Sequence, residues 1–244
     1  MTAALNFIDI SKHFGGAHAL NRVNFTVNPG LAFGLAGVNG AGKTTLLKCM
    51  LDLCSASSGT VEIFDVPATE NRARARLAFL PERFIPPYYQ TGRDFLSMMA
   101  GLRGDSFDEA QACSMFERLD LDQSALTRPV KTYSKGMTQK LGLASCFMAD
   151  RELIVLDEPM SGLDPKARAH VKVLLNDLKR RGYTLFFTSH ALIDIEETCE
   201  QMAVLHGGSL RFVGTPAALR ARSESISLER AFLDLIAAPE AIAT

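Results

Sequence analysis

Short apolar runs alternate with helix-spaced apolar positions along most of the 244-residue chain. Four of the runs are mostly apolar and are bounded by polar or turn residues, which is typical of buried strands. These runs lie at 31–37, 76–81, 152–159 and 183–190. Apolar residues recur every three or four positions at 44–53 and 164–182, which predicts helices there. Strands that alternate with helices favour an α/β fold with a mostly parallel sheet covered on both faces.

The pattern changes at the N-terminus and in the middle of the chain. Segments 5–10 and 20–27 mix apolar and polar residues at short spacing, and a turn signal follows at 28–30. Antiparallel β segments are therefore expected at the N-terminus. From 84 to 149 the apolar residues have helical spacing, with few β-branched residues between them. This stretch predicts a helical subdomain inserted into the core.

Together these signals predict a single domain that covers residues 1–235. A hairpin with two glycines at its turn is expected at 202–214, and an amphipathic helix follows it. The predicted parts are a core at 1–83 and 150–222, the helical subdomain at 84–149, and a C-terminal helix at 226–237.

The composition of the chain argues against several classes of protein. Hydrophobic residues make up 47% of the chain and charged residues 22%, as in ordinary globular proteins. The net charge of -1 gives no sign of a nucleic-acid partner. The five cysteines form no C-x-x-C pair, so they are expected to be buried thiols in a reducing compartment. We expect no signal peptide and no membrane-spanning helix, because no long uninterrupted apolar stretch occurs.

The segment from Gly37 to Thr44 matches G-x-x-x-x-G-K-[ST], with an apolar strand before it and a helix after it. Its glycines allow backbone conformations that turn several N–H groups inward, and the helix that begins at Gly42 adds its positive end. Lys43 would reach the β- and γ-phosphates, and the Thr44 hydroxyl would ligate Mg²⁺. The loop predicts a nucleoside triphosphate site formed by Gly37, Val38, Asn39, Gly40, Ala41, Gly42, Lys43 and Thr44. A guanine-reading N/T-K-x-D segment is absent from the sequence, which argues against a GTPase.

Two apolar strands end in candidate catalytic residues. Asp157 and Glu158 follow four apolar residues, and neighbouring strand side chains point to opposite faces. We therefore assign Asp157 to Mg²⁺ and Glu158 to the attacking water, the alternative being a solvent-facing charge pair. His190 ends a strand expected beside the phosphate-loop strand. A neutral histidine there can accept a proton from water and donate to phosphate, although a structural histidine is an equal alternative.

Six features in this order resemble the nucleotide-binding subunit of ATP-binding-cassette transporters. They are Phe14 in "KHFGG", the phosphate loop, "LPERF", "YSKGM", "LIVLDEP" with "SGLDP", and "TSH". The resemblance covers nearly the whole chain, up to about residue 235. It implies a P-loop NTPase core that binds ATP and Mg²⁺ and hydrolyses ATP to power a separate transmembrane permease.

The resemblance also implies roles for single residues. Phe14 falls where the family stacks an aromatic ring on adenine, although a core phenylalanine is the alternative. Thr45 would touch the α-phosphate, and His190 matches the family's switch histidine. Ser134 and Gly136 would contact ATP held by Lys43 of a second subunit in a head-to-tail pair, while Ser134 is also a plausible helix cap. Residues 161–164, which end at Asp164, resemble the loop that couples the two nucleotide sites.

The chain departs from the family at two motifs. Glu82 stands where the family usually has Gln, and its carboxylate could ligate Mg²⁺. Lys135 and Met137 stand where the signature motif usually has Gly and Gln, and Lys135 either faces a partner's phosphate or faces solvent. Both departures are similar to an export-type branch that includes drug, ion and polysaccharide exporters and the copper-site maturation system.

The expected partners are a permease and a second ATP-binding subunit, which would be another copy of this chain. The permease would dock at 85–92 and 93–103 of the helical subdomain and would hold the chain at the cytoplasmic face of the cell membrane. No nucleic-acid partner is expected. The alternative is a soluble cassette ATPase that acts on ribosomes or DNA. The single cassette, the lack of long coiled-coil insertions and the near-zero charge argue against that alternative.

Overall fold

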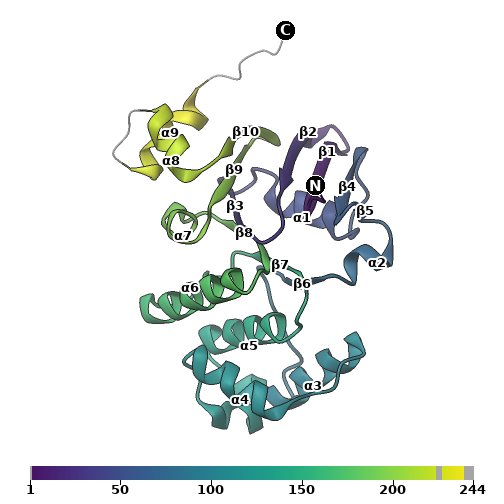
Figure 1. Cartoon of the computed structure of the whole chain (residues 1–244), viewed down its shortest axis with the longest axis vertical. Coiled ribbons are helices and arrows are strands. Elements are labelled where there is room, and N and C mark those ends of the chain that lie inside the picture. Colours follow the sequence, from purple (N-terminus) through teal and green to yellow (C-terminus); the bar gives the residue numbers. More distant parts are fainter. Residues whose placement is uncertain (1, 224–226, 239–244) are drawn as a thin grey trace.

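The computed structural model describes residues 2–223 and 227–238, and its strands form two sheets (Figure 1). The larger sheet has the strand order β10-β9-β3-β8-β7-β6. Its strands are β3 (Ala32–Ala36), β6 (Leu77–Leu80), β7 (Leu153–Asp157), β8 (Thr184–Ser189), β9 (Gln201–His206) and β10 (Ser209–Gly214). Neighbouring strands run parallel, except that β10 is antiparallel to β9. The predicted mostly parallel sheet and the hairpin at its edge are confirmed.

The smaller sheet is antiparallel and lies at the N-terminal end of the chain, as the sequence predicts. Its strand order is β2-β1-β4-β5. The strands are β1 (Leu5–Phe14), β2 (Ala17–Val27), β4 (Ser58–Ile63) and β5 (Val66–Pro67). The β1–β2 hairpin turns at Gly15, which has a φ of 57°.

Nine α-helices and two 3₁₀ turns lie in the described ranges. The α-helices are α1 (Lys43–Met50), α2 (Asn71–Arg74), α3 (Gly92–Arg103), α4 (Glu109–Arg118), α5 (Lys135–Phe147), α6 (Pro165–Arg180), α7 (Leu192–Thr198), α8 (Pro216–Arg222) and α9 (Leu228–Ala237). The 3₁₀ turns are η1 (Gln123–Thr127) and η2 (Val130–Thr132). The predicted C-terminal helix begins at Leu228, and residue 226, where we expected its start, lies outside the described residues. Measured by length and apolarity, none of these helices could cross a membrane.

The central strands β3, β7 and β8 of the larger sheet are buried on both faces. Along β3, Phe33 and Leu35 belong to one apolar core, whereas Ala32 and Ala36 belong to the other. This alternation is the period of two expected for a strand. In the first core, rings from the two sheets stack in the order Phe7, Phe25, Phe33 and Phe186, with neighbouring centroids 4.4, 5.3 and 5.8 Å apart. The second core lies under α5, α6 and α7, so β3 and β8 are fixed between two packed layers.

The elements between 84 and 149 are helical, as predicted, and α3, α4 and α5 gather at one end of the molecule (Figure 1). Helix α5 joins this group to the larger sheet. A Cβ at Gly142 would lie 2.6 Å from Leu80 of β6 and 2.9 Å from Phe84, so glycine permits the close approach. The beginning of α5 is therefore held at a fixed place relative to the sheet.

Candidate functional site

A cavity of about 610 Å³ opens where β3 and β7 end and the loops after them begin. Its volume lies in the usual range for small-molecule sites. The cavity is lined by Ala19, Val38, Asn39, Gly40, Ala41, Gly42, Lys43, Thr44, Thr45, Glu82, Asp157, Glu158 and His190. The structure thus brings together most of the predicted phosphate-loop residues with Glu82 and the three candidate catalytic residues. Ala19 of β2 was not predicted, because a small residue in an N-terminal strand gives no sign of a site.

The phosphate loop has the backbone conformation that its glycines allow. Gly40 and Gly42 have φ values of 81° and 108°, in the left-handed region. A Cβ at Gly42 would lie 2.7 Å from the Ala19 carbonyl oxygen, and one at Gly37 would lie 2.6 Å from the Leu205 carbonyl oxygen. Helix α1 begins at Lys43, one residue later than predicted, with Gly42 as its cap. The loop therefore approaches the neighbouring backbone closely on two sides.

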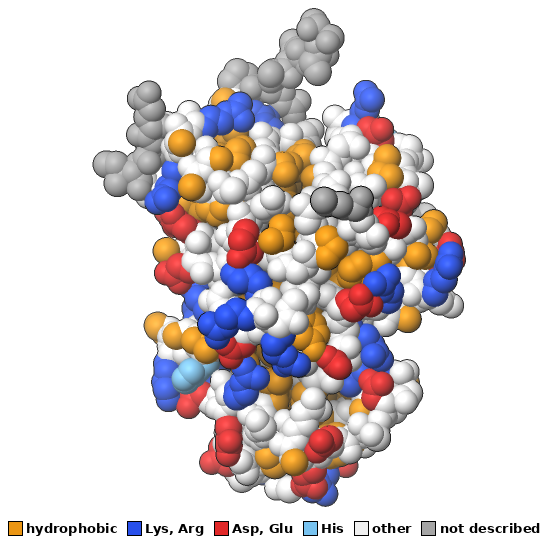
Figure 2. Space-filling model, in the orientation of Figure 1, with side chains coloured by type: hydrophobic (Ala, Val, Ile, Leu, Met, Phe, Trp, Pro, Cys, Tyr) orange, Lys and Arg blue, Asp and Glu red, His pale blue; other side chains and the backbone are white. Residues whose placement is uncertain are grey.

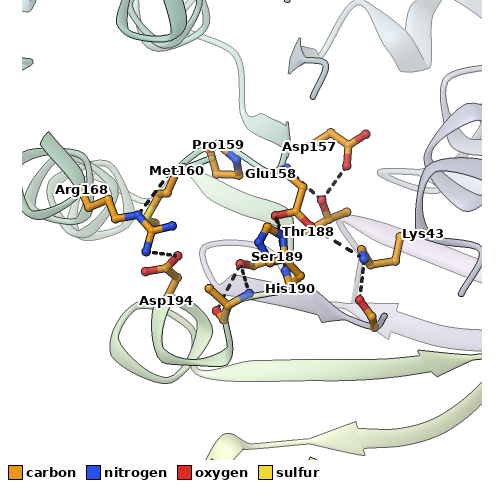
Figure 3. Close-up of polar contacts among 12 residues, drawn as sticks. Lys43, Asp157, Glu158, Pro159, Met160, Arg168, Thr188, Ser189, His190 and Asp194 are labelled. Atoms are coloured by element: carbon orange, nitrogen blue, oxygen red, sulfur yellow. Dashed lines mark hydrogen bonds and ion pairs between the residues drawn. The ribbon is translucent and has the colours of Figure 1, made fainter. Parts of the chain in front are cut away.

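Lys43 is a buried cation that faces the acidic end of β7. Its Nζ donates to the Gly37 carbonyl oxygen at 2.6 Å and lies 3.8 Å from Glu158 Oε1 (Figure 3). A buried charge is costly unless it is paired and hydrogen-bonded. Both conditions are met here, so the ammonium group is held at the cavity rather than in solvent.

Thr188 of β8 connects the two acids. Its hydroxyl donates to Asp157 Oδ1 at 2.6 Å and accepts a hydrogen bond from the Glu158 N–H at 2.9 Å (Figure 3). Sequence reasoning missed this residue. Thr188 was visible only as part of "TSH", and its pairing with Asp157 depends on the register of β7 against β8.

Asp157 and Glu158 do not point to opposite faces of the sheet, so that part of the prediction is wrong. Asp157 ends β7, but Glu158 has a φ of 51° and has left the strand. The strand alternation consequently stops at Asp157, and both carboxylates line the same cavity. The solvent-facing alternative is also wrong, because both residues are buried.

His190 lies against Glu158. Its Nδ1 is 2.8 Å from Glu158 Oε2, and its backbone N–H donates to the same oxygen at 3.3 Å. A proton on Nδ1 makes the ring contact a hydrogen bond and leaves Nε2 as an acceptor. The strand before His190 is β8, which pairs in parallel with β3 as predicted.

Three carboxylates meet one buried lysine at this cavity. Burial raises the pKa of Asp157, and the charges of Glu82 and Glu158 raise it further, while the Thr188 hydrogen bond and Lys43 oppose the shift. A cation at the Asp157 side would stabilise the ionised carboxylate. The described residues contain no cluster of three or more His, Cys, Asp or Glu side chains that could enclose a metal. An open set such as Thr44 with Asp157 fits Mg²⁺, which keeps several waters and binds substrate phosphates.

Phe14, Ser134, Gly136 and Asp164 are not among the described residues that line the cavity. Phe14 is 54% exposed at the end of β1, with Lys12 Nζ 4.9 Å from its ring centroid, so the core alternative is wrong. Ser134 caps α5 by accepting from the Met137 N–H at 3.2 Å, and Asp164 caps α6 by accepting from the Ala167 N–H at 2.8 Å.

The beginning of α5 and the loop at 161–164 lie side by side within one chain. A Cβ at Gly162 would lie 2.8 Å from Cε of Lys135, so the lysine side chain rests against this glycine. Lys135 is nevertheless exposed. Its ammonium group is thus close to the loop that ends at Asp164.

Comparison with known proteins agrees with this geometry. The family model described as ABC transporter matches residues 20–161. An ABC transporter ATP-binding protein of Synechocystis sp. is 36% identical over 209 residues, and the match covers 84% of this chain and 59% of that protein. The Nod factor export ATP-binding protein I of Burkholderia lata is 34% identical over 223 residues, with coverage of 89% and 72%.

A solved structure shares the fold. It is an ATP-binding cassette in a dimeric post-hydrolysis state with ADP and Pi. Its TM-score is 0.79 at 19% identity, over 86% of this chain and 98% of that one. The family match, the two relatives and the arrangement around Lys43 agree: the chain belongs to the ABC transporter family, among its ATP-binding proteins.

Proposed function

We propose that this chain binds and hydrolyses ATP and thereby powers a separate membrane permease. The observation that carries the proposal is the convergence of Lys43, Asp157, Glu158 and His190 on one cavity beside the phosphate loop. The loop supplies inward-facing N–H groups and the N-terminus of α1, which together favour a phosphate chain. ATP-binding relatives of the chain support ATP as the nucleotide.

Each residue at the cavity has its own proposed role. Lys43 would hold the β- and γ-phosphates, and Thr45 would touch the α-phosphate. Glu158 would orient the attacking water, because its carboxylate is fixed by the backbone N–H and ring of His190. Thr44 and Asp157 would hold Mg²⁺, with Glu82 at the exposed side of the cavity. When bound, Mg²⁺ would offset the negative charge of the phosphate oxygens.

A second subunit would complete the site. Ser134, Gly136 and Asp164 lie outside the cavity of their own chain, and Ser134 is exposed at the N-terminus of a 13-residue helix. The N–H groups at such a helix end favour an anion. We propose that they meet the ATP held by a second copy in a head-to-tail dimer, an assembly supported by the dimeric cassette of the same fold.

The permease would dock on the helical subdomain, at the membrane's cytoplasmic face. Four large apolar or aromatic side chains are exposed there, at Ile85, Tyr88, Tyr89 and Leu102. Exposed apolar patches are common at protein interaction sites. The Burkholderia lata relative is an export protein by name, and export is the direction we propose for this chain.

Replacing Glu158 by Gln tests the proposal, since glutamine keeps the shape of the side chain and removes its charge. The variant should bind ATP, lose Mg²⁺-dependent hydrolysis and accumulate as a dimer in light scattering. Glu152→Gln is the control, because Glu152 pairs with Arg76 at the other end of β7. Hydrolysis by Glu158→Gln at the parental rate would show that Glu158 does not position the water.

A separate comparison addresses Glu82. The Mg²⁺ dependence of hydrolysis should shift when Glu82 is replaced by Gln, because a carboxylate binds Mg²⁺ more strongly than an amide does. Superimposable Mg²⁺ curves for the two proteins would reject a metal role for Glu82.

A further inference from the structure

The segment that follows Glu158 is held by a helix outside the cavity (Figure 3). Arg168, in the first turn of α6, donates from Nε to the Met160 carbonyl oxygen at 3.3 Å. Met160 is two residues after Glu158, and the Pro159 ring between them limits the backbone freedom of that short connection. A shift of Arg168 would therefore be transmitted to the backbone next to Glu158.

The same arginine faces a buried acid on the next helix. Arg168 Nη1 lies 3.9 Å from Asp194 Oδ2, and Asp194 is 1% exposed in the first turn of α7. Its other oxygen, Oδ1, lies 2.8 Å from Lys172 Nζ. A buried carboxylate is stable only when it is paired with a cation, and removing one partner destabilises the folded protein. Asp194 does not line the main cavity, so it has no direct part in the proposed phosphate chemistry.

Asp194 stands four residues after His190, and the connection between them is short and bonded. The Ala191 N–H donates to the Ser189 hydroxyl at 3.0 Å, and that hydroxyl lies 3.2 Å from the Ala191 carbonyl oxygen (Figure 3). The Asp194 N–H donates to the same carbonyl at 3.1 Å. The start of α7 is therefore bonded to the turn that contains His190.

These contacts close a ring. The backbone connects Glu158 to Met160, and the Met160 carbonyl accepts a hydrogen bond from Arg168 of α6. Arg168 in turn lies 3.9 Å from Asp194 of α7. From Asp194 the bonded turn leads back to His190, whose ring lies 2.8 Å from Glu158 Oε2. Glu158, Met160, Arg168, His190 and Asp194 also lie around one small gap beside the main cavity, too narrow to hold a water molecule.

We propose that Arg168 and Asp194 are positioning residues that hold Glu158 and His190 in register for the hydrolytic step. The inference rests on the proposed ATP hydrolysis and extends it to two side chains that do not line the main cavity. Arg168 fixes the loop on the Glu158 side, and Asp194 fixes the turn on the His190 side. Loss of this link would change the turnover rate while ATP binding at Lys43 persisted.

The competing explanation is an ordinary ion pair that fastens α7 to α6. Lys172 separates the two explanations. It lies on α6 and is closer to Asp194 than Arg168 is, and it also pairs with Glu197 of α7 at 2.6 Å. Both described partners of Lys172 are thus on α7, whereas Arg168 also binds the loop after Glu158. If Asp194 served only to fasten α7 to α6, replacing Lys172 should lower the stability of the protein more than replacing Arg168 does.

The test compares Arg168→Ala with Lys172→Ala in the full chain. Arg168→Ala should lower kcat roughly tenfold or more, because misplacing a catalytic group by about 1 Å can cost about 100-fold. Its KM for ATP should stay within about twofold of the parent, as expected when ground-state binding is intact. Lys172→Ala should lower kcat less than Arg168→Ala does, even if its melting temperature falls further, because Lys172 holds Asp194 whereas Arg168 also binds the loop after Glu158. Parental kcat in Arg168→Ala, or an equal loss in Lys172→Ala, would overturn the inference.

A second measurement does not depend on turnover. The chain has five histidines, so the ring resonance of His190 can be assigned by NMR from its loss in His190→Ala. Arg168→Ala should shift that resonance more than Lys172→Ala does, whereas an unchanged His190 signal in Arg168→Ala would refute the link. If the parent protein failed to hydrolyse ATP with Mg²⁺, the proposed function would fall, and the NMR comparison would still decide whether Arg168 positions His190.

Discussion

The side-chain amide of Gln139 donates a hydrogen bond to the carbonyl oxygen of Pro159 at 3.0 Å, within the protein interior. Gln139 lies on α5, the helix capped by Ser134, and Pro159 directly follows Glu158. The helix end proposed to face a partner's ATP is thus tied to the carboxylate proposed to act on the chain's own ATP. One hydrogen bond joins the two halves of the proposed composite site.

The Gln139–Pro159 bond predicts a loss of stability in Gln139→Leu. Leucine has a similar volume but no donor, so the buried Pro159 carbonyl would lose its partner at a cost of about 1–3 kcal/mol. In a chain of this size, each ~1 kcal/mol lowers the melting temperature by about 2–4 °C. Circular dichroism during heating measures the change. Gln111→Leu, on the exposed face of α4, is the control, and equal melting temperatures for the two variants would contradict the prediction.

Gly42→Ala should abolish ATP binding. Alanine would need a φ near 108° and would place its Cβ 2.7 Å from the Ala19 carbonyl, so the loop would have to rearrange. Gly101→Ala is the matched control, because Gly101 is on α3 with nothing within 4 Å of the added Cβ. The control should gain about 0.5–1 kcal/mol in stability from helix propensity. Titration with a fluorescent ATP analogue measures binding, and undiminished affinity in Gly42→Ala would refute the loop's assignment.

The phosphate loop and the main elements were predictable because their signals are local. Spacing fixes the position of Lys43 after three glycines, and apolar periodicity separates β7 and β8 from α6 without any tertiary information. Helix α8 was missed, although Thr215 and Pro216 form the usual cap and first position, because its seven residues carry one large apolar side chain, Leu219, which sets no period.

The parts that could not be predicted depend on pairs far apart in the sequence. Thr188 reaches Asp157 only through strand register, and Arg168 faces Asp194 only because α6 packs beside α7. The backbone at Glu158 could not be predicted for a different reason. Its positive φ ends the strand alternation one residue early, and no residue type at that position signals such a backbone.

Phe14→Ala should weaken ATP affinity by about two- to twelve-fold, the range expected for loss of one aromatic stacking contact. Phe14 is at the end of the hairpin whose second strand carries Ala19 to the cavity, and its ring is exposed, with Lys12 Nζ 4.9 Å from the ring centroid. Phe14→Tyr should keep the parental affinity. Tyr89→Ala removes an even more exposed ring from the helical subdomain and should leave ATP titrations unchanged. An identical affinity for Phe14→Ala and the parent would reject adenine stacking.

Asp157→Asn should make the protein more stable at neutral pH. The stability of this variant should no longer respond to Mg²⁺ and ATP. Burial raises the pKa of Asp157 above its usual 3.8, so the native state binds the proton more tightly than the unfolded chain does. The ionised carboxylate therefore destabilises the native state above the folded pKa, and this cost vanishes as the pH falls below about 3.8. Asparagine can still accept the Thr188 hydrogen bond but carries no charge beside Glu82 and Glu158.

Thermal unfolding of Asp157→Asn across pH measures the effect. Its advantage over the parent should be a few degrees at pH 7 and should shrink as the pH approaches 4. Asp122→Asn should behave in the opposite way, since hydrogen bonding to Ser124 lowers the pKa of Asp122, and the stability that its carboxylate adds is complete above the unfolded pKa and is lost as the pH falls through the folded pKa. An advantage of Asp157→Asn that grew toward acid pH, or that persisted with Mg²⁺ and ATP, would mean that Asp157 is not the strained metal-binding acid of this site.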